Sequence, residues 1–116
     1  MKKFKIGLSF LLFSLFSSNS GAVADLQNVT ITALNMNRGL GNFLFIRTSA
    51  TPTVVGCQTN PDWNLILPLD SDLSNKIYSA LLAAQASQSK VILGGTGTCN
   101  SSFGIELLNN FTILKP

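Results

Sequence analysis

The chain contains no histidine among its 116 residues. Histidine is the commonest general base, the base of serine and cysteine triads, and a frequent zinc ligand. Of the five Asp and Glu side chains, Asp70 and Asp72 flank Ser71 where a helix is expected to begin. These residues are interpreted as helix-capping groups rather than as a catalytic pair or a cluster of metal ligands. The sequence therefore predicts no catalytic residues, no metal site and no cofactor, and hence no enzyme.

Charge is also scarce, since Asp, Glu, Lys and Arg make up only 11% of the chain. Of the eight Lys and Arg residues, Lys2, Lys3 and Lys5 lie near the N-terminus, which leaves five basic residues against five acidic ones. A nucleic-acid partner is bound through several clustered Lys or Arg side chains. The five remaining basic residues are Arg38, Arg47, Lys76, Lys90 and Lys115. They are all separated in sequence, so no nucleic-acid partner is expected.

The chain lacks an apolar run long enough to cross a bilayer. Its most apolar stretch, residues 6–16, is about half of the ~20 residues that a transmembrane helix needs. This stretch follows the N-terminal lysines and precedes the small-x-small pattern Ala22-Val23-Ala24, which signal peptidase reads. Residues 1–24 are therefore predicted to be a signal peptide cleaved after Ala24. Residues 25–116 then form an exported domain, secreted or periplasmic, with no membrane span after cleavage.

Only two cysteines are present, Cys57 and Cys99. Export compartments favour disulfides, and a single domain of about 92 residues has a marginal core that a cross-link would supplement. Bridging the pair closes a loop of about 43 residues, for which chain entropy predicts ~4 kcal/mol of stabilisation. We predict a Cys57–Cys99 disulfide; the alternative is a pair of free buried thiols.

Alternating and β-branched residues predict five strands around one helix. A turn region at 35–41 joins the first two strands into a hairpin. In the last strand Ile105 and Leu107 share one face, so Glu106 on the opposite face is expected to be a solvated edge charge. The glycines at 94–97 are expected to link the fourth strand to the disulfide. The predicted strands cover residues 29–34, 42–48, 63–67, 91–93 and 104–114.

The helix is predicted over residues 72–87. Leu73, Ile77 and Leu81 recur at i, i+4 and i+8 and form one apolar stripe. Several alanines add helix propensity and allow close approach to a sheet.

This order predicts a mainly β domain with one α-helix, as a five-stranded OB-type barrel (β-β-β-α-β-β). The helical stripe would plug one end of the barrel. Cys57 precedes the third strand and Cys99 precedes the fifth, so the disulfide would join two loops. An α+β open sheet with one packed helix is the alternative.

Trp63 is the residue with the strongest indication of a ligand. Aromatic faces stack on sugars and bases, and polar side chains surround it, among them Asn60 and Asn64. These three are the candidate ligand-binding residues. The alternative is that Trp63 packs the end of the barrel beneath the disulfide loop.

Several segments together resemble a known group of proteins. The stretch Cys57…Trp63-Asn64-Leu65, the helix segment Tyr78 to Ala84, the run Val91-Ile92-Leu93, and Gly95-Thr96-Gly97-Thr98-Cys99 with Gly104-Ile105-Glu106 carry the resemblance. They are similar to small exported proteins of Gram-negative bacteria, and in turn to the receptor-binding B subunits of AB5 toxins of the subtilase-cytotoxin type. The resemblance covers roughly residues 57–114.

Those B subunits are disulfide-bonded OB folds that form rings and bind host glycans. The resemblance therefore implies a non-catalytic, glycan-binding module, with a host or environmental glycan as partner and a homo-oligomeric ring as assembly. The alternative function is a structural or inhibitory envelope protein that binds a protein partner. A small hydrolase using Asp or Glu alone is a more remote hypothesis.

Overall fold

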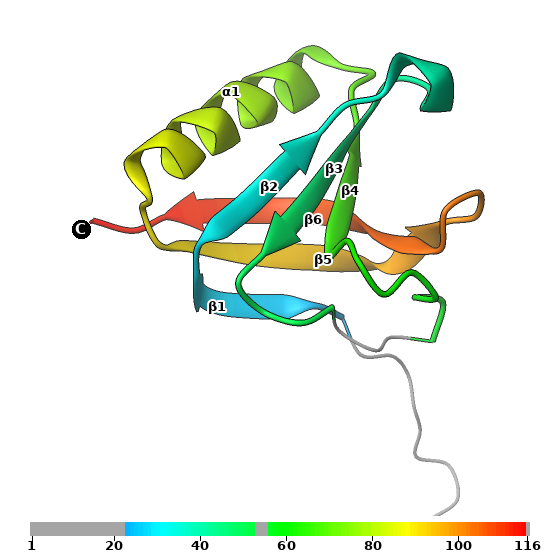
Figure 1. Ribbon diagram of the computed structural model, residues 1–116, viewed down its shortest axis with the longest axis horizontal. Helices are drawn as coiled ribbons and strands as arrows, with labels where there is room; N and C mark the ends of the chain where they lie inside the picture. The colour runs from blue at the N-terminus through cyan, green and yellow to red at the C-terminus, as the bar shows by residue number, and fades with distance from the viewer. Residues whose placement is uncertain (1–22, 53–55, 116) are drawn as a thin grey trace, which may run out of the picture.

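The computed structural model describes residues 23–52 and 56–115 (Figure 1). The predicted signal peptide lies outside the described residues except for Val23 and Ala24. In the described ranges, no helix combines the length and the apolar character needed to cross a membrane.

Residues 23–52 and 56–115 are mainly β with one α-helix, as predicted. The six strands in these ranges form one mixed sheet in the order β1-β5-β6-β4-β3-β2, and all neighbours are antiparallel except the parallel pair β4 and β6. In Figure 1, β2, β3 and β4 run across β1, β5 and β6, and α1 lies along one side. The elements are β1 (Asp25–Val29), β2 (Ile31–Asn35), the short 3-10 helix η2 (Arg38–Leu40), β3 (Phe43–Thr48), β4 (Leu65–Pro68), α1 (Asp72–Ser87), β5 (Val91–Asn100) and β6 (Ile105–Ile113).

The sheet is not closed, because β1 and β2 form its two ends and are not paired with each other. The predicted five-stranded OB-type barrel is therefore not confirmed. The expected first strand is divided at Thr30, where the chain leaves β5, the partner of β1, and joins β3, the partner of β2. Asn28 adopts a left-handed conformation (φ 57°) just before this division, and Thr30 is hydrogen-bonded to Ser49 through both backbone groups.

Cys57 and Cys99 form the predicted disulfide, with their Cα atoms 5.8 Å apart. The expectation that it joins two loops is wrong on one side, because Cys99 lies within β5. This strand is longer than the expected 91–93 and includes the glycines at 94–97. Antiparallel pairing with β6 keeps the glycine-rich segment extended beyond its apolar start.

The helix spans the predicted residues. Ser71 is its N-cap, and its hydroxyl accepts a hydrogen bond from the Ser74 N–H. The predicted stripe is only partly correct, because Leu81 is fully buried whereas Leu73 is 66% exposed. Eight residues of helix leave these two side chains about 80° apart around the axis, so they do not share one face. The inward face comprises Ser74, Ile77, Leu81 and Ala84.

Two apolar clusters lie on opposite faces of the β3–β4 region. Along β3, Leu44 and Ile46 point into the larger cluster, which also contains Leu81 of the helix. The alternate residues Phe43 and Phe45 belong to a smaller cluster on the other face. Because successive strand residues point to opposite faces, β3 presents aromatic rings away from the helix-covered core.

Glu106 is 1% exposed, so its prediction as a solvated edge charge is wrong. Its face of β6 is the interior one, whereas Ile105 and Leu107 face the smaller cluster. Further along, the register between β5 and β6 shifts, with Gly94 opposite Asn110 and Gly95 opposite Leu108. Asn109 is the extra residue, and such a bulge changes which side chains point inward.

Candidate functional site

Four aromatic side chains form a continuous group that we call the aromatic patch: Phe43, Phe45, Trp63 and Phe103. Phe45 is buried, and the other three are half-buried around it. The Phe45 ring centroid lies 5.1 Å from that of Phe103 and 5.8 Å from that of Trp63. Phe43 packs edge-on against Phe103 at 5.7 Å. These spacings and tilts are those of favourable aromatic pairs, so the patch is a packed surface rather than a set of isolated rings.

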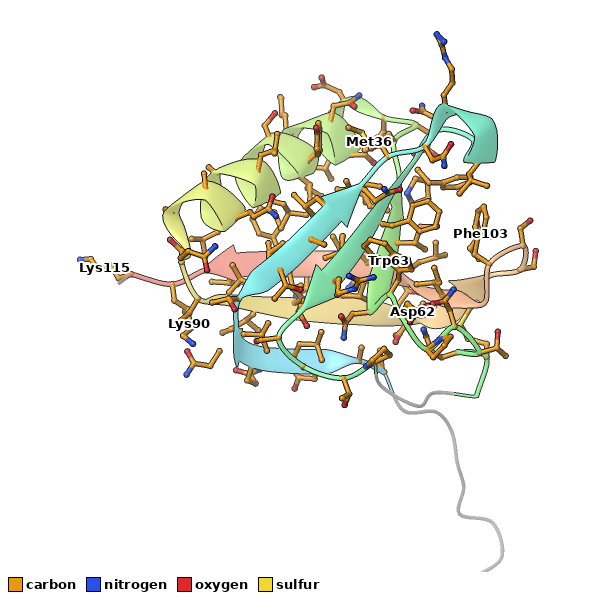
Figure 2. The ribbon with its side chains drawn as sticks, in the orientation of Figure 1. Met36, Asp62, Trp63, Lys90, Phe103 and Lys115 are labelled. Carbon is orange, nitrogen blue, oxygen red and sulfur yellow. A yellow bond between two sulfur atoms is a disulfide. The ribbon has the colours of Figure 1, made fainter. Side chains whose placement is uncertain are left out.

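Three separate segments build this patch. Phe43 and Phe45 come from β3, Trp63 stands just before β4, and Phe103 lies in the turn between β5 and β6. In Figure 2, Trp63 and Phe103 lie toward one end of the molecule, whereas Lys90 and Lys115 lie at the other end.

Arg47 covers part of the patch. Its Cζ atom lies 4.4 Å from the centroid of the Trp63 ring, and its Nε donates a 3.0 Å hydrogen bond to the Asp62 carbonyl. A guanidinium over an indole face is held by the ring quadrupole. Arg47 therefore occupies one face of Trp63, and its remaining N–H groups are available at an exposed position.

Asn60 organises the loop that carries Trp63. Its side-chain oxygen accepts hydrogen bonds from the backbone N–H groups of Asp62 (2.8 Å) and Trp63 (3.1 Å). Gln58 donates to the carbonyls of Asn60 and Trp63, and its own oxygen accepts the Glu106 N–H at 2.8 Å. Asn60 thus orients Trp63, and its carboxamide oxygen is already used within the loop.

Asn64 is 3% exposed and does not reach the surface. Its oxygen accepts the Thr48 N–H at 2.7 Å, and its amide donates to the Ala50 carbonyl at 3.1 Å. Of the three predicted ligand residues, Trp63 belongs to the patch and Asn60 lies beside it. The structure assigns Asn64 to bridging the end of β3.

A hollow of about 350 Å³ adjoins the patch at the tip of the β2–β3 hairpin. Phe43 belongs to both features, and Met36 lies at this tip in Figure 2. The Asn37 oxygen accepts the Gly39 N–H, which closes the tip. The hollow is lined by Met36, Asn37, Arg38, Gly41, Asn42, Phe43 and Leu69.

The described residues offer no grouping of three or more His, Cys, Asp or Glu side chains that could hold a metal ion. Asp72, one of the two carboxylates near the helix start, forms an exposed ion pair with Lys76 at 3.1 Å. The side chains around the patch can stack on a ligand and form hydrogen bonds to it.

Sequence reasoning missed Phe43, Phe45, Phe103 and Arg47 as neighbours of Trp63. The sequence did contain a signal for the β3 residues, because positions 43–46 are all apolar. A strand with such a continuous apolar run is expected to be covered on both faces. Phe103 joins them only through the return of the chain from β5 to β6. Comparisons of this chain with protein-family models, with curated proteins and with solved structures found no match.

Proposed function

We propose that the protein is an exported, non-catalytic binding module that takes an oligosaccharide on the aromatic patch. One observation carries the proposal: three half-buried rings and the Arg47 guanidinium stand together on the face opposite the helix-covered core. Aromatic rings stack on the apolar faces of sugars, and the adjoining hollow has hydrogen-bonding side chains that can take hydroxyl groups. The hollow contributes Asn37, Arg38 and Asn42.

The strand order supports an OB-type arrangement. β1 and β2 are separated by Thr30 alone and stand at the two ends of the sheet order. If β1 and β2 are counted as two halves of one bent strand, strand one, then β3, β4, β5 and β6 become strands two to five. The sheet order is then 1-4-5-3-2-1, and the helix lies between strands three and four. OB folds bind oligosaccharides and oligonucleotides on the face of strands two and three, with the loops after strands one and four.

In that scheme the patch and the hollow coincide with the ligand face. β3 is strand two, Trp63 leads into strand three, Phe103 lies in the loop after strand four, and the hollow lies in the loop after strand one. By analogy with OB folds, a ligand would lie on this face of the domain.

A sugar is favoured over a nucleic acid because the patch lacks a cluster of basic groups. Arg47 is the basic residue of the patch, and Arg38 lines the hollow. Binding to a phosphate backbone rests on many such contacts. The resemblance to toxin B subunits agrees with a sugar ligand, and it suggests a ring of identical subunits as the assembled form.

The experiment is a glycan array probed with the oxidised domain and with Phe103→Ala, which removes a half-buried ring from a turn. Leu82→Ala on the exposed helix surface is the matched control. We expect discrete glycan signals that fall at least tenfold in Phe103→Ala and are unchanged in Leu82→Ala. A blank array, or signals that Phe103→Ala leaves intact, contradicts the proposal. A purified bacterial protein bound at the patch in place of a glycan would instead establish the protein-partner alternative.

A further inference from the structure

Glu106 is a carboxylate buried inside the domain. One oxygen lies 2.8 Å from the Gly97 N–H, and both oxygens lie 3.2 Å from the Ala24 N–H. Gly97 has φ 89°, a conformation that glycine adopts readily. Three contacts from backbone N–H groups thus surround the charge.

No basic side chain in the described part of the chain forms an ion pair with Glu106. Within the described ranges the ion pair that forms joins Lys76 to Asp72, on the helix surface. A buried charge is costly unless it is hydrogen-bonded and paired with an opposite charge. Glu106 is hydrogen-bonded, but among residues 23–52 and 56–115 no side chain of opposite charge pairs with it.

Ala24 is built into the core beside Glu106. It is 3% exposed, belongs to the larger apolar cluster, and its carbonyl accepts the Gly95 N–H at 3.0 Å. Its own N–H is the one that reaches Glu106. Cleavage after Ala24 would remove these contacts. The Gly95 N–H would lose its acceptor, and the Glu106 carboxylate would lose the Ala24 N–H donor.

A second small-x-small pattern, Ser20-Gly21-Ala22, stands two residues upstream of the first one. We propose that signal peptidase cuts the Ala22–Val23 bond and that the new α-ammonium of Val23 is the counter-charge of Glu106. Water adds across this peptide bond, so that Ala22 gains the carboxylate of the released peptide and Val23 gains the amino group. Val23 is 46% exposed. It directly precedes Ala24, whose N–H contacts Glu106, and consecutive Cα atoms are about 3.8 Å apart.

This inference rests on the export that the proposed function includes, and the first test separates the two. The full chain is expressed in a Gram-negative host, and the exported protein is analysed by intact mass and N-terminal sequencing. We expect the sequence Val23-Ala24-Asp25. An N-terminus at Asp25 overturns the inference and leaves export standing, whereas a chain that retains residues 1–22 contradicts both.

The second test addresses the counter-charge. Domains beginning at Val23 and at Asp25 are released from fusions without extra residues and oxidised, each with and without Glu106→Gln. We expect the domain beginning at Val23 to melt at least about 10 °C higher, the shift that losing two buried hydrogen bonds gives at this size. Equal melting temperatures would overturn the role of Ala24.

Acetylation of the Val23 amino group isolates the charge itself, because it leaves the Ala24 contacts in place. Acetylation should lower the melting temperature of the wild-type domain by several degrees and leave Glu106→Gln unchanged. If acetylation lowers the melting temperature of the wild-type domain and of Glu106→Gln equally, the pairing of the ammonium with Glu106 is overturned.

Discussion

Gly95 and Glu106 are expected to depend on each other. A Cβ atom added at Gly95 would collide with the Oε2 and Cδ atoms of Glu106, although Gly95 lies in β5 without a positive φ that would exclude alanine. Gly95→Ala must therefore push the carboxylate away from the Ala24 and Gly97 N–H groups. Overpacking costs about 1–3 kcal/mol, and each buried donor that is left without an acceptor costs a similar amount. We therefore expect Gly95→Ala to lower the free energy of unfolding by about 3 kcal/mol or more. At 4–8 °C per kcal/mol, the melting temperature should fall by roughly 12–24 °C.

The assay is a double-mutant cycle by urea denaturation at neutral pH. Glu106→Ala alone is expected to cost about 2–4 kcal/mol, because the same two N–H groups lose their acceptor. In the Glu106→Ala background the space is free, so Gly95→Ala should cost less than about 1 kcal/mol. The coupling should thus be at least about 2 kcal/mol, whereas additive costs within ~0.5 kcal/mol would refute the reasoning.

Gly94→Ala is the matched control for this cycle. Its Cβ would also meet a side chain, the carboxamide of Asn110, but Asn110 is exposed and can turn into solvent. We expect Gly94→Ala to lower the free energy of unfolding by less than about 1 kcal/mol, both in the wild type and in the Glu106→Ala background. A large cost at Gly94 would indicate that β5 rejects any side chain here, whatever Glu106 does.

Three further predictions concern the frame of the domain. Cys57→Ser with Cys99→Ser should lower the melting temperature by more than about 15 °C, since the bridge is worth ~4 kcal/mol by chain entropy; a shift below about 5 °C by calorimetry would contradict this. Asn64→Ala should cost about 2–3 kcal/mol in urea denaturation because two backbone groups lose their partner, yet the folded fraction should retain any glycan binding. Leu81→Ala should cost about 2–5 kcal/mol and Leu73→Ala less than about 0.5, and comparable losses would refute the inward face assigned to α1.

The sequence by itself determined the features that depend on neighbouring residues. The helix begins and ends where its N-cap and its alanine-rich pattern predict, because capping and helix propensity act within a few residues. The pairing of Cys57 with Cys99 followed from their number and the predicted export. The content of one helix in a mainly β domain followed from the two hydrophobic periods.

The tertiary structure decided the features that depend on distant residues. Glu106 alternates with apolar neighbours, but which face of β6 is the interior depends on β4, β5 and the N-terminal segment around it. Leu73 matches the period of Leu81 only approximately, and the sheet selects which helical face is covered. The division of the first strand at Thr30 exists because its two halves pair with β5 and β3.

The aromatic patch shows the same division between local and distant causes. Trp63 stands out in the sequence as the single tryptophan among polar residues, and the structure does bring it to a half-buried edge. Its partners Phe45 and Phe103 come from segments far apart in the chain, joined by strand pairing and by the cluster they form. Local sequence sets which side chains are available, whereas only the packing of the sheet sets which of them meet, because side-chain contacts across strands carry no short-range signal in the sequence.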